Sequence, residues 1–177
     1  MNFADLRDLF ENYTGVSESE VEDIDLALWF NEAQLDLAYD LGNIKSYTYE
    51  DGVASGEEND LPSDVINLVD STSEYEITLT GKIIFTNSGT QTIYYRAIPT
   101  SFTGIDPDAE CELHEALHYL LAIFAASRYW DKESEGDSEE SQHATKWMQY
   151  YYQGKNAALS KLSIVNNINK VDRWIIE

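Results

Sequence analysis

The chain has 177 residues, 43% of them hydrophobic, which is enough for one well-buried core and too few for two enzyme-sized domains. Its 33 acidic residues outnumber 11 basic ones and give a net charge of −22, which disfavours a protein that grips nucleic acid through its phosphates. A single cysteine, Cys111, excludes an intrachain disulfide, and no apolar run could cross a bilayer, so we expect an intracellular protein without membrane association.

The first part of the chain is predicted to be helical. The stretch "FADLRDLFENYTG" (3–15) has the apolar spacing of a short helix that ends at Gly15. The segment "SESE" (17–20) reads as a capping box that opens a second helix running to about Leu41.

The second helix carries two apolar stripes, which require two partners. The first consists of Val21, Ile24, Leu28, Leu35 and Ala38. The second consists of Leu26, Phe30, Ala33, Leu37 and Leu41. Either both stripes are enclosed within the monomer, or the second stripe is a subunit interface with a neighbouring copy.

Residues 44–103 are predicted to form an inserted antiparallel β lobe. Strands are expected at 66–70, 75–80, 82–86 and 91–97, with "NSG" (87–89) as a hairpin turn.

Helix resumes after this lobe. Asp106 and Pro107 are typical of a helix start, so a third helix is expected from about 107 to 132, buried on nearly all sides. A fourth helix is expected from about 138 to 162, with Ala144, Trp147, Met148, Tyr151, Ala158 and Leu162 facing inward. The predicted fold is mainly α with a β insertion (α+β): an antiparallel helical bundle (1–43 and 104–162), a β-sheet lobe, and a C-terminal tail (163–177).

The segment "HEALH" (114–118) matches the His-Glu-x-x-His signature of zinc peptidases, in which two histidines one helical turn apart share a zinc ion. His114 and His118 are therefore a weak candidate metal pair. A third ligand is missing, because positions 121 and 124 are Leu and Phe, and only Glu32 or Asp36 could supply a carboxylate. We predict no metal, no cofactor and no catalytic residue.

The layout resembles the head–tail connector, or adaptor, proteins of tailed bacteriophages, in the version with an inserted β lobe. The resemblance rests on "LPSD", "GKIIF", "TIYYRAIPT" and, above all, "HEALHYLLAIFAASRYWDKESEGDSEESQHATKWMQYYYQGKN". It implies a structural virion protein of the neck, made in the host cytoplasm. Its copies would form a ring, dodecameric in the family, which binds the portal protein and the next neck or tail protein. DNA would pass through the ring without specific binding.

The resemblance also implies a role for the tail, because the C-terminal segment of such proteins commonly reaches onto the portal. Residues 163–177 would be a docking arm. Its anchors and charge partners would be Ile164, Val165, Lys170, Arg173, Trp174, Ile175 and Ile176. The alternatives are a zinc-dependent hydrolase that uses "HEALH" and an acidic intracellular binding module.

Overall fold

The computed structural model describes residues 1–17, 19–134 and 138–174, and it describes side chains up to Lys161 with the exception of Ser138. The chain divides into two compact units. The helical unit comprises Met1–Leu41 and Thr100–Glu177, and the β unit comprises Gly42–Pro99. The chain is therefore α+β, and the strands found among the described residues all lie in one continuous segment.

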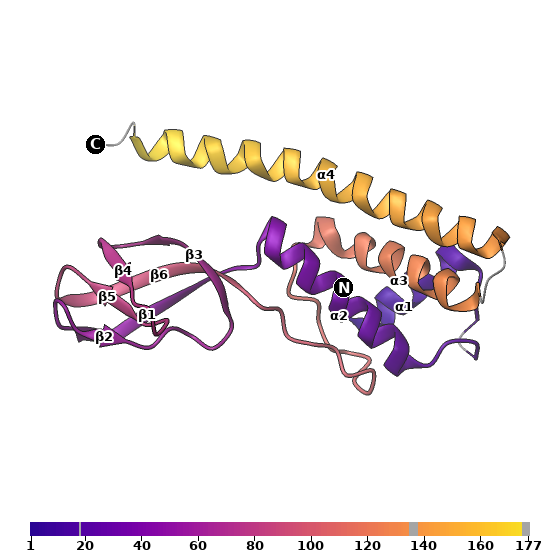
Figure 1. Cartoon of the computed structure of the whole chain (residues 1–177), viewed down its shortest axis with the longest axis horizontal. Coiled ribbons are helices and arrows are strands. Elements are labelled where there is room, and N and C mark those ends of the chain that lie inside the picture. The colour runs from indigo at the N-terminus through magenta and orange to yellow at the C-terminus, as the bar shows by residue number, and fades with distance from the viewer. Residues whose placement is uncertain (18, 135–137, 175–177) are drawn as a thin grey trace. The chain divides into compact units, whose positions relative to one another are not determined.

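The helical unit is organised around one buried helix (Figure 1). Its elements are α1 (Phe3–Thr14), α2 (Asp23–Leu41), the short 3₁₀ helix η1 (Glu115–Leu117), α3 (His118–Glu133) and α4 (Ser138–Trp174). Helix α3 packs against α1, α2 and α4. Every side chain from Leu120 to Ser127 is buried, which confirms the prediction of a central helix that is apolar on nearly all sides.

Helix α1 follows its sequence signals closely. The Asn2 side chain accepts a hydrogen bond from the Asp5 N–H (2.8 Å), and the Asp5 carboxylate accepts one from the Asn2 N–H (3.1 Å). These bonds satisfy two of the amide groups that a helix start leaves without partners. At the other end, Gly15 has a φ of 73° and its N–H bonds to the Glu11 carbonyl.

Helix α2 begins later than predicted. The Glu20 carboxylate accepts hydrogen bonds from the N–H and the hydroxyl of Ser17, both at 2.7 Å, and the Glu20 N–H returns to the Ser17 carbonyl at 3.0 Å. These contacts close a turn, and the helix starts only at Asp23. The bond from the Ser17 N–H to the Glu20 carboxylate is one half of the predicted capping box, and here it closes a turn instead of opening a helix.

The predicted third helix also begins later, because residues 107–111 bind the start of α1. The N–H groups of Phe3 and Ala4 donate to the carbonyls of Ala109 (2.9 Å) and Pro107 (3.0 Å), and Asn2 and Glu110 form a β-bridge. The first amides of a helix need external acceptors, and here this segment supplies them instead of continuing as helix. Helix α3 starts only at His118.

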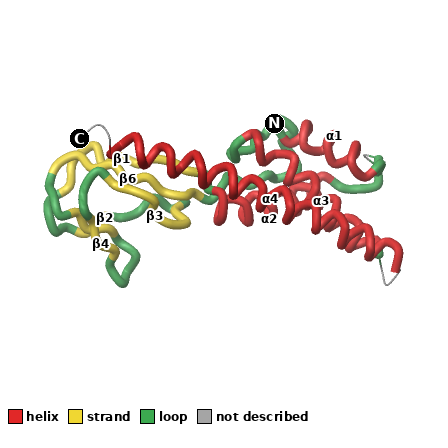
Figure 2. The backbone as a smooth tube through the Cα atoms, turned by 90° about the horizontal axis from the view of Figure 1, so that it is seen from above, coloured by secondary structure: helices red, strands yellow, loops and turns green. Residues whose placement is uncertain are grey.

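The β unit consists of two three-stranded antiparallel sheets (Figure 2). One has the order β1 (Ile44–Val53), β6 (Gly89–Ala97), β3 (Val65–Ser71), and the other β2 (Glu58–Asn59), β5 (Ile83–Phe85), β4 (Tyr75–Ile77). Their shared core is Val53, Ile83, Phe85, Ile93, Tyr95 and Ala97.

Two details of the β prediction are wrong. Strands β1 and β2 were not predicted. The turn Asn87–Gly89 does not close a hairpin, because β5 and β6 belong to different sheets and this turn links them. The paired hairpin is β4–β5, whose turn includes a hydrogen bond from the Thr78 N–H to the Lys82 carbonyl (2.9 Å).

Helix α4 extends from Ser138 to Trp174, beyond the predicted end near Leu162. Of the predicted inward residues, Ala144 and Tyr151 are buried, Trp147, Met148 and Ala158 are half-buried, and the side chain of Leu162 is not described. Among the described residues, no helix is both long enough and apolar enough to span a membrane.

Candidate functional site: the outer face of helix α2

The inner face of α2 forms the core of the helical unit. Leu26, Phe30, Ala33 and Leu37 have no exposed surface. Phe30 meets Phe3 edge to face, with ring centroids 5.7 Å apart. The prediction that these four residues form a subunit interface is wrong, because residues enclosed within one chain present nothing to a neighbour. The fifth residue of that set, Leu41, is half-buried.

The outer face of α2 carries exposed apolar side chains instead. Ile24, Leu28, Leu35 and Tyr39 are 65%, 56%, 40% and 54% exposed. The first three belong to the other predicted stripe, whose remaining members, Val21 and Ala38, are buried. The spacing of 24, 28, 35 and 39 places all four side chains on one side of the helix. We call Ile24, Leu28, Leu35 and Tyr39 the outer face.

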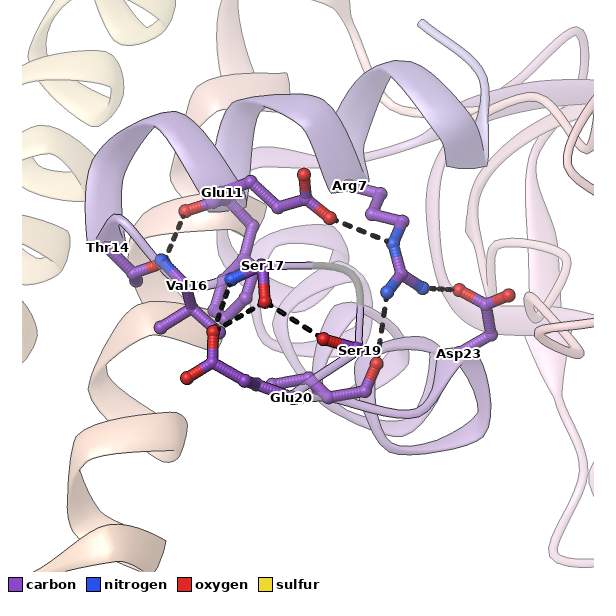
Figure 3. A network of polar contacts seen from close by, with 10 residues as sticks. Arg7, Glu11, Thr14, Val16, Ser17, Ser19, Glu20 and Asp23 are labelled. Carbon is purple, nitrogen blue, oxygen red and sulfur yellow. Dashed lines mark hydrogen bonds and ion pairs between the residues drawn. The ribbon is translucent and has the colours of Figure 1, made fainter.

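Arg7 of α1 fixes the start of α2 (Figure 3). Its guanidinium donates to the Glu11 carboxylate (3.1 Å) and to the Val21 carbonyl (3.0 Å), and it forms an ion pair with Asp23, the first residue of α2. Although Arg7 is buried, its charge is matched by two carboxylates, which is the condition under which a buried ion is tolerated.

The chain that returns from the β unit is held along α2 by Asn31. The Asn31 amide donates to the Phe102 carbonyl and accepts from the Phe102 N–H, both at 2.8 Å. Two residues later, Gly104 passes so close to α2 that a Cβ atom there would lie 2.7 Å from the Asp23 carbonyl oxygen. The outer face is thus built on a helix that is held at several points.

A groove of about 390 Å³ lies between α2, α3 and α4 beside the outer face. Leu35 and Tyr39 form part of one wall, and Arg128 of α3 bonds to Glu32 of α2 (3.0 Å) within it. Its lining residues are Glu32, Leu35, Asp36, Tyr39, Phe124, Arg128, Tyr151 and Tyr152. The combination of aromatic walls and charged rims suits a helix or peptide that is both apolar and charged.

A buried lysine ties α4 to α2. The Lys155 ammonium lies 2.7 Å from Asp36 and 2.6 Å from Asp40, and the Tyr151 hydroxyl donates to Asp36 at 2.5 Å. Burial lowers the pKa of Lys155, but the hydrogen bonds with the two carboxylates outweigh it and raise the pKa overall. Burial and the bond to Asp36 likewise raise the pKa of Tyr151. The sequence prediction missed this cluster; its only signal was a lysine four residues after an inward tyrosine.

The histidines of the predicted zinc motif serve local structure. His114 precedes η1, and its Nδ1 accepts a hydrogen bond from the Ala116 N–H (3.2 Å). His118 begins α3 and is buried; its Nε2–H donates to the Leu113 carbonyl at 2.7 Å, and its Nδ1 lies 3.4 Å from the Met1 nitrogen. Both ring nitrogens of His118 are therefore occupied, and burial lowers the pKa of its ring.

The carboxylates that could have completed a zinc site are engaged elsewhere. Glu32 pairs with Arg128, and Asp36 binds Lys155 and Tyr151. Among the residues that the structure describes, no group of three or more His, Cys, Asp and Glu side chains could hold a metal ion. The zinc interpretation therefore gains no support from the geometry.

The backbone of helix α4 includes five residues of the predicted docking arm: Ile164, Val165, Lys170, Arg173 and Trp174. Ile175 and Ile176 lie outside the described residues. A comparison of the chain with protein-family models and with curated protein sequences found no match.

Proposed function

We propose that this chain is a structural virion protein of the connector type. Its copies form a ring below the portal, extend the DNA channel and present the surface to which the tail attaches. The observation that carries the proposal is the outer face of α2, where three aliphatic side chains and a tyrosine are exposed on a helix whose opposite face already fills the core. Contiguous exposed apolar surface of this kind marks a protein–protein contact.

The charge distribution supports a role next to DNA without DNA binding. Acidic residues outnumber basic ones by 16 to two in residues 1–60 and by 11 to two in residues 106–140. Such a surface repels the phosphate backbone, so a duplex in a channel lined by it slides and does not stick.

The C-terminal residues are proposed as the portal-docking arm. Residues 141–177 carry five basic and two acidic side chains, which reverses the balance of the rest of the chain. A basic segment that also carries Trp174, Ile175 and Ile176 suits an acidic and partly apolar partner. Because α4 continues to Trp174, much of this arm would reach the portal as a helix.

The test is a binding experiment between the full chain and a candidate portal protein, read by electron microscopy and by co-sedimentation. We expect ring-shaped particles on the portal. The triple variant Trp174→Ala/Ile175→Ala/Ile176→Ala should lose attachment, whereas Tyr150→Ala, which removes an exposed aromatic side chain from the middle of α4, should keep it. Chains that stay monomeric at high concentration both with and without the portal would refute the proposal.

A further inference from the structure

Strand β1 forms the longest regular edge of the β unit. It lies at one end of the sheet β1-β6-β3 and pairs with β6 through six consecutive residues, 44–49, before the register shifts. The opposite edge, β3, has two irregularities in its register, and the edges of the second sheet, β2 and β4, are two and three residues long. Bulges and short strands protect a sheet edge against pairing with another chain. Among the described strands, β1 alone has a long and regular outer edge.

The backbone groups of alternate residues of β1 point away from the sheet. The Ala97 N–H donates to the Asn43 carbonyl (2.8 Å), so the odd-numbered residues of β1 exchange hydrogen bonds with β6. The N–H and C=O groups of Ile44, Ser46 and Thr48 therefore point outward. Among the described residues, none of these six groups has a hydrogen-bond partner. Groups in this alternating arrangement are satisfied by one kind of partner, an extended strand.

The outward edge is open and is not protected by charge. A groove of about 710 Å³ lies beside it, lined by residues 46–52 and Asn59. The three outward residues have exposed, uncharged side chains. Lys45 is directed to the Asp64 carboxylate (3.3 Å), so it does not block the edge in the way that an edge lysine does. In a chain with 33 acidic residues, residues 41–49 contain none.

We infer that β1 of one copy pairs with β1 of a second copy, as antiparallel strands related by a two-fold axis at Ser46. In this register the two Ser46 residues face each other, and Ile44 of each copy faces Thr48 of the other. Every outward N–H and C=O group of both strands then gains a partner. The two three-stranded sheets become one continuous sheet of six strands.

The sequence of β1 is compatible with this register, although the whole chain is strongly acidic. The acid nearest the axis, Glu50, lies four residues from it and faces Gly42 of the second copy. The one charged residue of the paired segment, Lys45, faces Tyr47 of the second copy. Like charges directly opposite each other would destabilise the pair, and this register brings none together.

The inference goes beyond the proposed function, because it concerns two free copies and holds whether or not a ring forms. A two-fold contact uses the same surface on both copies and closes on itself. It therefore produces pairs, whereas a ring requires a contact between two different surfaces. Pairing also removes an exposed strand edge, which is otherwise a site of aggregation.

The test is disulfide formation between full-length chains that each carry one cysteine. The background is Cys111→Ser, because Cys111 is buried and its S–H bonds to Gln34, which serine can still do. Ser46→Cys places two thiols at the two-fold axis, in a hydrogen-bonded pair whose Cα atoms lie ~5.5 Å apart, within the range of a disulfide. Thr48→Cys is the matched control. It is also outward and exposed, but the two copies of position 48 are separated by four residues, ~14 Å along the strand.

Ser46→Cys should form disulfide-linked dimers about tenfold faster than Thr48→Cys, or more, because cysteines whose Cα atoms are more than ~7 Å apart are not bridged without backbone movement. Mixing Ile44→Cys with Thr48→Cys should join unlike chains faster than either protein joins to itself. Equal rates for Ser46→Cys and Thr48→Cys would overturn the inference, and so would a mixture that shows no preference for unlike chains.

A charge exchange gives a second measurement that does not depend on disulfide geometry. Ser46→Lys and Ser46→Glu each place like charges opposite each other at the axis, so each alone should be monomeric in sedimentation equilibrium where the wild type forms dimers. A mixture of the two should form dimers again. Dimers that persist in both single variants would contradict this contact, as would a wild type that stays monomeric at about 1 mM. Portal binding by Ser46→Lys should be unchanged, so failure of this contact and failure of the proposed function are separate outcomes.

Discussion

Gly104 tests how tightly the chain returning from the β unit is fixed against α2. It has a φ of 73°, and an added Cβ atom would lie 2.7 Å from the Asp23 carbonyl oxygen and 2.8 Å from its carbon. Gly15 has the same φ of 73°, but nothing lies within 4 Å of its Cβ position. Gly104→Ala and Gly15→Ala therefore share the backbone strain, and only the first adds a collision with backbone atoms.

The expected costs follow from these two terms. A left-handed conformation costs an alanine roughly 1–2 kcal/mol, so Gly15→Ala should lower the free energy of unfolding by about that amount. In Gly104→Ala the segment must also move away from α2, which weakens the two 2.8 Å bonds between Asn31 and Phe102. At ~1 kcal/mol for each bond, the total should reach about 3–4 kcal/mol.

The free energy of unfolding of both variants is measured by equilibrium urea unfolding of the full chain. The transition is followed by the circular dichroism of the helices, and the free energy is extrapolated linearly to zero urea. Gly104→Ala should be the less stable variant by about 2 kcal/mol, equal to the two weakened bonds. Equal losses for the two variants would show that the segment moves aside without cost and that its contact with α2 does not hold it in place.

Three further outcomes are expected. Lys155→Met should cost about 2–4 kcal/mol in urea unfolding, because it leaves two carboxylates adjacent without their cation, whereas Lys161→Met on the exposed surface should cost under about 0.5 kcal/mol. His118 has a folded pKa below its unfolded value, so its contribution to stability is present above roughly pH 6.5 and is lost as the pH falls further. The stability of the wild type relative to His118→Gln should then fall by up to about 1.4 kcal/mol per pH unit between pH 6.5 and 5.5, and a constant difference would contradict the neutral, buried ring. Protein purified without chelator should contain well under one zinc per chain, and stoichiometric zinc lost in His118→Gln would contradict the hydrogen-bonded roles of the histidines.

Local signals predicted helix α1 and the buried character of α3. Helix α1 ends at Gly15 as predicted, and α3 is apolar on nearly all sides because it packs against α1, α2 and α4. The start of α2 was mispredicted because the motif at Ser17 and Glu20 satisfies its hydrogen bonds within a turn. Such a local pattern does not show whether a helix continues after the turn.

Long-range contacts decided the features that the sequence did not predict. Residues 107–111 carry helix-start signals at Asp106 and Pro107, yet they are held by the amides of α1 about a hundred residues away. Long-range contacts also decide which of the two stripes of α2 faces the core. The sequence alone does not show this, because both stripes have helical spacing. The inner stripe is the one that the rest of the unit covers: Leu26, Phe30, Ala33 and Leu37 have no exposed surface, and the Phe30 ring meets Phe3 and Phe102 edge to face.

The outer face of α2 combines exposed apolar side chains with acids that are already paired. Asp23 pairs with Arg7, Asp25 with Lys132, Glu32 with Arg128, and Asp36 and Asp40 with Lys155. The charge of this helix is therefore largely balanced, and the net charge of −22 comes mainly from the rest of the chain. That charge adds a long-range repulsion between copies, which salt screens. In the proposed ring, the apolar contact between copies has to outweigh this repulsion, so assembly should become stronger as the salt concentration rises.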